Sequence, residues 1–240
     1  MCRMIGVFAR EPIETARFLD ALVAQARDGR RPPGPQSRPH EDGYGVAVFS
    51  GDHWIHIREM CPMWEGALEA SRVLRGTVML LHARLASVNT AIDLTKLHPF
   101  AAATEKMPTL MFCHNGTIRG AQRLPVACPD HATDTERYFA LVQDRITHGD
   151  GLSEALSIAV QTIYSAVGED AVSVNALLTD GREMVAYRGR IRPENRDYHT
   201  LFVAEGDGLR IVSTEPFDCP GAGEWRGMAP EEMLVWRPDS

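Results

Sequence analysis

Several features common in chains of this size are missing here. No apolar run approaches the roughly 20 residues that a membrane-spanning helix needs, and the apolar stretch 4–9 is too short for the core of a signal peptide. Acidic residues outnumber basic residues, and the net charge of −7 argues against nonspecific binding to nucleic acid. Together these absences predict a cytoplasmic protein that binds neither membranes nor nucleic acid.

The cysteines and histidines lack the spacings of disulfide frameworks and metal sites. The five cysteines are odd in number and contain no C-x-x-C pair, so we expect reduced thiols. His53 and His56 invite comparison with metal hydrolases, but residues three apart on a strand point to opposite faces. H-E-x-x-H is also absent. We therefore predict no metal and no cofactor.

Hydrophobic periodicity predicts strands at both ends of the chain and helices among them. The expected strands are 4–9, 43–50, 53–60, 77–84, 109–115, 172–179, 184–189, 199–206, 209–214 and 233–236. Strands 43–50 and 53–60 are expected to form a hairpin through Gly51-Asp52. The expected helices are 12–23, 64–74, 134–146 and 152–167. This order favours an α+β sandwich of layered sheets and helices. Without repeats or a clear linker, we expect one domain over residues 1–240.

A long irregular segment interrupts this pattern at residues 28–43. It contains four prolines and three glycines, which leave no helical or strand periodicity. Loops of this length are either functional lids or surface insertions, and composition does not separate the two.

Cys2 directly follows the initiator methionine. Removal of Met1 would place a thiol and a free α-amine on one residue. Such an amine has a pKa of about 7.7–8.0, so much of it is neutral near pH 7.5 and can accept the thiol proton. Cys2 is then a candidate nucleophile that carries its own base; the alternative is an incidental residue near a terminus.

The segment Cys113-His114-Asn115-Gly116-Thr117 ends an expected strand. Acyl transfer generates an oxyanion that needs fixed donors, and an Asn amide followed by a Gly backbone N–H supplies two. Asn115 and Gly116 are therefore candidates for an oxyanion hole. Because Asn-Gly is also a common hairpin turn, that alternative stays open.

Two further motifs carry opposite charges. Arg84, which leaves a strand in HARLAS, can bind a carboxylate through two parallel hydrogen bonds, and Ser87 can add a hydroxyl; the alternative is a solvated strand end. Asp134, in TDTE, either caps a helix or binds an ammonium group. A nucleophile, an oxyanion hole, a carboxylate binder and an ammonium binder together fit glutamine or a γ-glutamyl compound.

Seven motifs resemble, in order, those of the class II glutamine amidotransferases, a family of N-terminal nucleophile hydrolases. They are MCRMIGVFA, HEDGYGVA, HARLAS, HPF, HNGTI, TDTE and STEPF. The resemblance is to the stand-alone YafJ-like branch, which includes the amidohydrolase of ergothioneine biosynthesis. It covers residues 2–217 and leaves 218–240 as a C-terminal extension.

The resemblance implies a four-layer αββα sandwich and a role for each motif. Cys2 would be the nucleophile, Asn115 and Gly116 the oxyanion hole, and Arg84 and Ser87 the binders of the substrate α-carboxylate. Asp134 would bind the α-ammonium group. His98, in HPF, matches a family histidine near the pocket, whereas His82 and Asp42-Gly43 would support the site.

The resemblance leaves the acceptor of the released ammonia open. Leu85 and Val88-Asn89 depart from the sugar-phosphate amidotransferases, and residues 219–240 match no acceptor domain. We therefore expect either a separate synthetase or acceptor subunit, or water as the only acceptor, as in a γ-glutamyl amidohydrolase. A homo-oligomer stays open, as does a non-catalytic protein that binds a γ-glutamyl ligand.

Overall fold

The computed structural model describes residues 2–31, 37–66, 68–86, 93–104, 107–190 and 198–238, and it contains two antiparallel sheets. The seven-stranded sheet has, in spatial order, β11 (Trp225–Gly227), β9 (Phe202–Gly206), β10 (Leu209–Ser213), β1 (Arg3–Glu14), β4 (Arg75–Ala83), β2 (Tyr44–Ser50) and β3 (His53–Glu59). The five-stranded sheet has β12 (Met233–Trp236), β8 (Met184–Tyr187), β7 (Ala171–Thr179), β6 (Met107–Ile118) and β5 (Phe100–Thr104).

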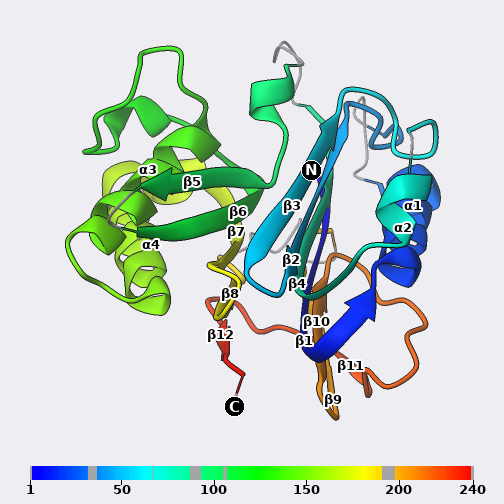
Figure 1. The fold of residues 1–240 in the computed structure, drawn as a ribbon. Helices are drawn as coiled ribbons and strands as arrows, with labels where there is room; N and C mark the ends of the chain where they lie inside the picture. The colour runs from blue at the N-terminus through cyan, green and yellow to red at the C-terminus, as the bar shows by residue number, and fades with distance from the viewer. Residues whose placement is uncertain are drawn as a thin grey trace.

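Helices cover the outer faces of the two sheets (Figure 1). They are α1 (Ala16–Asp28) and α2 (Glu69–Arg72) on the seven-stranded sheet, and α3 (Asp134–Thr147) and α4 (Leu152–Val167) on the five-stranded sheet. Three short 3₁₀ turns complete the described elements: η1 (Leu94–Lys96), η2 (Ala121–Arg123) and η3 (Gly168–Asp170). The fold is therefore the expected four-layer αββα sandwich.

Three apolar cores hold these layers together because alternate strand residues point to opposite faces. Phe18, Leu19 and Leu22 of α1 pack on one face of the seven-stranded sheet. A second core lies between α3, α4 and the five-stranded sheet, and a third, with Met4 and Cys113, lies between the two sheets. Each fully buried Leu or Phe contributes about 1.5–3 kcal/mol of transfer free energy.

Two predicted helix starts are wrong for tertiary reasons. β1 continues through Pro12 to Glu14, and its register against β4 shifts between Phe8 and Ile13. A proline, which has no N–H to donate, is tolerated in such a bulge. The helix predicted at 64–74 shortens to α2, and Gly66 before it packs so closely on the side chain of Tyr44 that a Cβ would clash.

The structure also changes the interpretation of the Asn-Gly pair. β6 does not end at residue 115 but continues to Ile118, with Asn115 opposite Asn175 and Gly116 opposite Val174 on β7. Asn115-Gly116 is therefore not a hairpin turn. The sequence analysis missed β5 and β11, whereas the hairpin of β2 and β3 and the helices α3 and α4 are confirmed.

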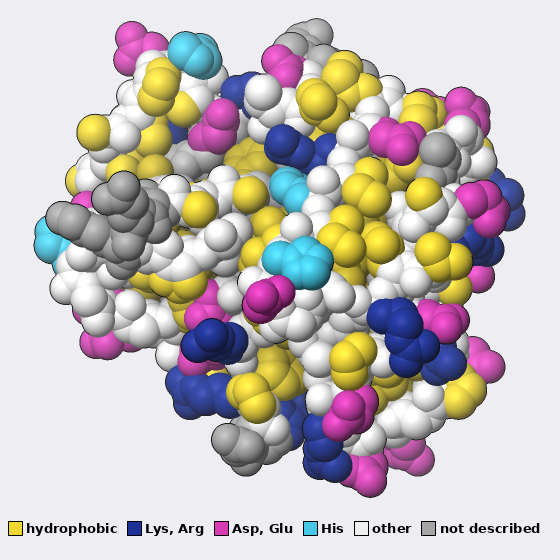
Figure 2. Space-filling model, in the orientation of Figure 1, with side chains coloured by type: hydrophobic (Ala, Val, Ile, Leu, Met, Phe, Trp, Pro, Cys, Tyr) yellow, Lys and Arg dark blue, Asp and Glu magenta, His cyan; other side chains and the backbone are white. Residues whose placement is uncertain are grey.

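The molecular surface carries interspersed charges. On the face shown in Figure 2, basic side chains lie next to acidic ones. Ion pairs such as Arg226–Glu232 and Arg237–Glu183 account for part of this pattern. Within the described ranges, no helix has both the length and the hydropathy needed to cross a membrane.

Candidate active site

Cys2 lies at the start of β1, half-buried between the two sheets. Its Sγ atom accepts a hydrogen bond from the backbone N–H of Leu85 at 3.5 Å, and its carbonyl oxygen accepts one from Asn115 Nδ2 at 3.0 Å. These bonds join the residue just before β1 to the loop after β4 and to the C-terminal part of β6. Cys2 is therefore held at its thiol by the loop after β4 and at its carbonyl by β6.

Arg3, the residue after Cys2, is held by an ion pair with Glu215. It is 1 % exposed, and its guanidinium pairs with Glu215 at 2.7 Å. Glu215 belongs to the STEPF motif, whose Thr214 accepts a hydrogen bond from Met4 N at 3.3 Å and donates one to Gln25 on α1 at 2.8 Å. STEPF is therefore a clamp on the N-terminal strand, a role that the sequence motif alone did not reveal.

The end of β6 presents Gly116 to the site. β5 pairs with β6 only as far as Phe112, so among the described strands residues 113–118 pair with β7 alone. A side chain on Gly116 would collide with the carbonyl oxygen of Ser173 on β7. Glycine is thus required here for the close approach of β7, and its backbone borders the same space as Cys2.

The loop after β4 carries Arg84, and Asp42 holds that loop in place. The backbone N–H of Arg84 donates to Gly43 O at 2.8 Å, and the N–H of Ala86 donates to Asp42 Oδ2 at 2.7 Å. Asp42 also accepts two hydrogen bonds from Arg38, at 2.5 and 3.2 Å. Residues 38–43 therefore support the wall of the site, as the resemblance implies for Asp42-Gly43. Residues 32–36 of the predicted loop lie outside the described residues.

The structure distinguishes the roles of Thr133 and Asp134 at the start of α3. Thr133 is the N-cap and forms a capping box with Glu136. The Asp134 carboxylate accepts one hydrogen bond on each oxygen: the backbone N–H of Ile118 donates to Oδ2 at 2.9 Å, and the backbone N–H of Thr135 donates to Oδ1 at 2.9 Å. Asp134 is therefore not the cap, and its side chain borders the space in front of Cys2.

Three buried histidines support this region. His98 Nδ1 lies 3.1 Å from His82 Nε2, and His114 lies 2.9 Å from Thr135 Oγ1 and 3.1 Å from Ser173 O. Burial lowers the pKa of His82 to about 3 and lowers the pKa values of His98 and His114. All three rings are consequently neutral at neutral pH. His114 and its link to α3 were missed by the sequence analysis because the histidine sits inside an apolar run.

These histidines predict a loss of stability on acidification. An unfolded histidine has a pKa near 6.5, so below that pH the unfolded chain binds protons that the folded chain does not. The free energy of unfolding should fall by about 1.4 kcal/mol per pH unit for each such proton, from about pH 6.5 towards pH 3 for His82. Urea unfolding at pH 7, 6 and 5 measures this slope.

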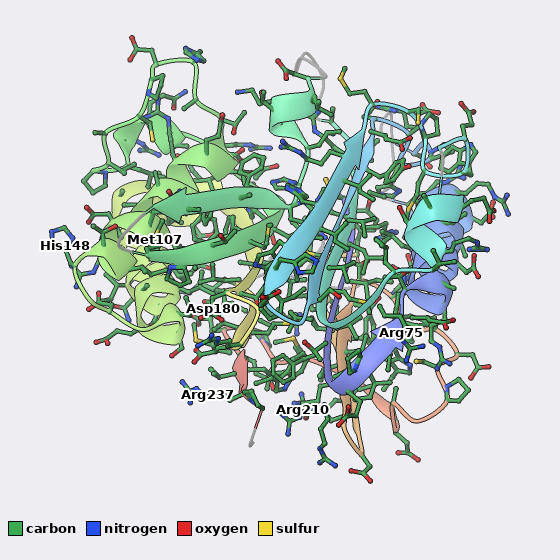
Figure 3. All side chains as sticks on the ribbon, in the orientation of Figure 1. Arg75, Met107, His148, Asp180, Arg210 and Arg237 are labelled. Atoms are coloured by element: carbon green, nitrogen blue, oxygen red, sulfur yellow. The ribbon has the colours of Figure 1, made fainter. Side chains whose placement is uncertain are left out.

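A matched pair of variants shows whether the buried histidines cause the pH dependence of the free energy of unfolding. His98→Gln should flatten it, because one lowered pKa is removed. His148→Gln should leave it unchanged, since His148 is 65 % exposed and points away from the outer end of α3 (Figure 3). Equal slopes in both variants would contradict the assignment.

These residues enclose a cavity of about 90 Å³. Its described lining residues are Cys2, Arg84, Leu85, Ala86, Lys96, His98, Phe100, His114, Gly116, Thr133, Asp134 and Thr135. Lys96 forms an ion pair with Glu136 at 2.9 Å. Arg84 and Asp134, which carry opposite charges, line the same cavity. Sites for drug-sized ligands occupy roughly 300–1,000 Å³, so this cavity suits a ligand of amino-acid size.

The structure therefore brings five predicted site residues to one cavity: Cys2, Arg84, His98, Gly116 and Asp134. Asn115 joins them through its bond to Cys2. Ser87 lies outside the described residues. Two larger hollows of about 620 and 780 Å³ have no cysteine or histidine among their described lining residues, so size alone does not locate the chemistry.

Comparison with known proteins shows the family of this chain. The family described as "Glutamine amidotransferases class-II" matches residues 1–195. The chain is 23% identical over 195 residues to the putative glutamine amidotransferase YafJ of Escherichia coli K12, covering 78% of this chain and 72% of that protein. It is 28% identical over 174 residues to a glutamine–fructose-6-phosphate aminotransferase of Bradyrhizobium diazoefficiens, covering 69% of this chain but 26% of that protein.

Solved structures share the fold at low sequence identity. A predicted glutamine amidotransferase from Pseudomonas aeruginosa has a TM-score of 0.60 at 17% identity, covering all of this chain and 98% of that one. The glutamine phosphoribosylpyrophosphate amidotransferase of B. subtilis has a TM-score of 0.71 at 17% identity. That match covers 99% of this chain and 48% of the other, so this chain spans about half of that enzyme.

Proposed function

Since the chain belongs to the class II glutamine amidotransferase family, we propose that it hydrolyses glutamine or a related γ-glutamyl amide through an N-terminal cysteine. The observation that carries this proposal is the convergence on one small cavity of a thiol, a glycine backbone and two opposite charges, Arg84 and Asp134. An α-amino acid head group carries the matching carboxylate and ammonium. The resulting substrate class is an amino acid with an amide on its side chain.

In the proposed reaction, removal of Met1 frees the α-amine of Cys2. The amine takes the thiol proton, and the thiolate attacks the γ-carbonyl carbon. The oxyanion is stabilised by the second Nδ2–H of Asn115, since the first holds Cys2 O, and by the N–H of Gly116. The C–N bond breaks, and the ammonium of Cys2 protonates the leaving nitrogen. Water then hydrolyses the thioester with the same amine as base, releasing the acid and the free thiol.

Arg84 and Asp134 position the head group in this scheme. Arg84 is 6 % exposed at the inner wall, where a guanidinium can bind both oxygens of the α-carboxylate. The Asp134 carboxylate is oriented by the N–H groups of Ile118 and Thr135, one on each oxygen, which leaves one further lone pair on each oxygen for an ammonium group. The enzyme would then recognise the γ-glutamyl head and tolerate different leaving groups.

Substrate analogues test this recognition. We expect the wild-type protein to cleave glutamine and a γ-glutamyl anilide, and to reject the matching analogues without the α-amine. Asp134→Ala should lose most of that discrimination, because a hydrogen bond to a charged group is worth about 1.5–3 kcal/mol. The measurement is kcat/KM for each of the four compounds with both proteins.

Two variants serve as controls in this assay. Thr133→Ala removes the cap of α3 without touching the Asp134 carboxylate, so it should keep the preference for the α-amine. Arg84→Lys keeps the charge but loses the paired hydrogen bonds, so kcat/KM should fall several-fold to about a hundredfold. Equal cleavage of deaminated compounds by the wild type would overturn the γ-glutamyl assignment.

A further inference from the structure

A pair of asparagines links the nucleophile to a segment far away in the sequence. Asn115 on β6 and Asn175 on β7 are directly opposite each other, so their Cβ atoms are about 4.5–5.5 Å apart on the same face. Asn115 Nδ2 donates to Cys2 O at 3.0 Å, and Asn175 Nδ2 donates to His199 O at 2.8 Å. The carbonyl groups of Cys2 and His199 thus each accept a hydrogen bond from one of two neighbouring amides.

Aromatic contacts place the same segment against Arg3. The Arg3 guanidinium lies 5.0 Å from the centroid of the Tyr198 ring, and the rings of Tyr198 and His199 are 5.5 Å apart. Neither Tyr198 nor His199 is among the residues that line the 90 Å³ cavity. Residues 198–199 therefore flank the start of β1 outside the proposed glutamyl pocket.

His199 has an unused polar atom at this position. Its side chain is 7 % exposed, and Nδ1 is buried without a hydrogen-bond partner among the residues that the structure describes. Burial, the largest cause, and the positive charge of Arg3 lower the pKa of His199 to about 4. The ring is therefore neutral at neutral pH, and in the tautomer with the proton on Nε2 its Nδ1 is an acceptor. A buried acceptor without a donor is uncommon in folded proteins.

We propose that His199 is a positioning residue whose Nδ1 accepts a hydrogen bond from the α-amine of Cys2 after Met1 is removed. This inference rests on the proposed function and adds the group that orients its base. With one N–H held by Nδ1, the lone pair of the amine can face Sγ. A free amine without such a partner would rotate about its bond to Cα and would face the thiol only part of the time.

The proton balance leaves His199 unchanged throughout. The thiol proton moves to the amine nitrogen as the S–C bond forms, and the resulting ammonium keeps one N–H on Nδ1. The ammonium then gives a proton to the leaving nitrogen as the C–N bond breaks. Because an acceptor interacts more strongly with an ammonium than with an amine, His199 should raise the pKa of the amine and stabilise the transition state of proton transfer.

Other charged groups nearby must be held constant in the test. The surroundings of Cys2 and Tyr198 contain several charged or titratable groups: Arg3, its partner Glu215, the Tyr198 hydroxyl and the buried Cys113 thiol. Substitutions are therefore limited to His199. His199→Leu removes the acceptor, whereas His199→Asn keeps it, since Asn Oδ1 occupies nearly the position of His Nδ1.

The first measurement is the pKa of the α-amine, which needs no turnover. Competitive labelling of the terminal amine across pH, followed by mass spectrometry, gives this value in the full-length Cys2→Ser protein. We expect the amine pKa to fall by about one unit with His199→Leu, which corresponds to a tenfold weaker hold on the proton, and to recover with His199→Asn. His148→Leu, at the exposed outer end of α3, should leave it unchanged.

The second measurement is the pH profile of glutamine hydrolysis with Cys2 intact. His199→Leu should lower kcat roughly tenfold to a hundredfold, move the acid limb to lower pH and leave KM nearly unchanged. An unchanged amine pKa in a folded, processed His199→Leu protein would overturn the inference. A shifted amine pKa in a protein that cleaves no γ-glutamyl compound would support His199 and instead refute the proposed function.

Discussion

Replacing Cys2 with alanine is expected to abolish hydrolysis, with kcat lower by roughly 10⁴-fold or more, as when other covalent catalysts lose their nucleophile. The thiol forms the acyl bond in the proposed reaction, and the remaining residues can only bind the substrate. Stability should change little, because Cys2 is half-buried and its backbone bond from Asn115 is retained. Steady-state kinetics and thermal unfolding of the same preparation measure both effects.

Cys2→Ser is the matched variant for this experiment. It preserves the size of the side chain but should retain very little activity, because a hydroxyl is far harder to deprotonate than a thiol by so weak a base. Activity of Cys2→Ala within a few-fold of wild type would place the nucleophile elsewhere, with Cys113 next to test. Intact mass is the necessary control, since retained Met1 on a fully active protein would contradict an amine acting as base.

Asn115→Ala is expected to lower kcat by roughly 10²–10³-fold with little change in KM, the cost of one donor in an oxyanion hole. The substitution also removes a second interaction, because the same side-chain amide of Asn115 donates a hydrogen bond to the Cys2 carbonyl oxygen at 3.0 Å. A displaced thiol would lower kcat further without weakening head-group binding. The assay is the hydrolysis of glutamine at saturating and subsaturating concentrations.

Ser173→Ala controls for disturbance of β6. Ser173 is fully buried, its hydroxyl donates to the Asn115 carbonyl oxygen at 3.1 Å, and it is not among the described residues that line the cavity. If the side-chain donor of Asn115 is itself what stabilises the oxyanion, Ser173→Ala should lower kcat only a few-fold. A pure KM effect of Asn115→Ala would mean that Asn115 binds the ground state and that the oxyanion assignment is wrong.

The seven ordered motifs were sufficient to predict the family and the four-layer sandwich. Local patterns also predicted the hairpin of β2 and β3 and the long helices α3 and α4. These features depend on neighbours in the sequence: turn residues such as Gly51-Asp52, a capping box at Thr133 and helical spacing of apolar residues. Chemistry carried by a residue type, such as the thiol of Cys2, is likewise visible without a structure.

Only the tertiary structure decided features that depend on contacts between distant segments. Pro12 lies in a bulge because β4 pairs with both sides of it, and Asn115-Gly116 is strand rather than turn because β7 pairs along its length. The Asp134 carboxylate is not the cap of α3 and accepts a hydrogen bond from the backbone N–H of Ile118, sixteen positions away in the sequence. The link between the carbonyl groups of Cys2 and His199 runs through two opposed asparagines on β6 and β7, and strand register is a property of the folded sheet that no local pattern encodes.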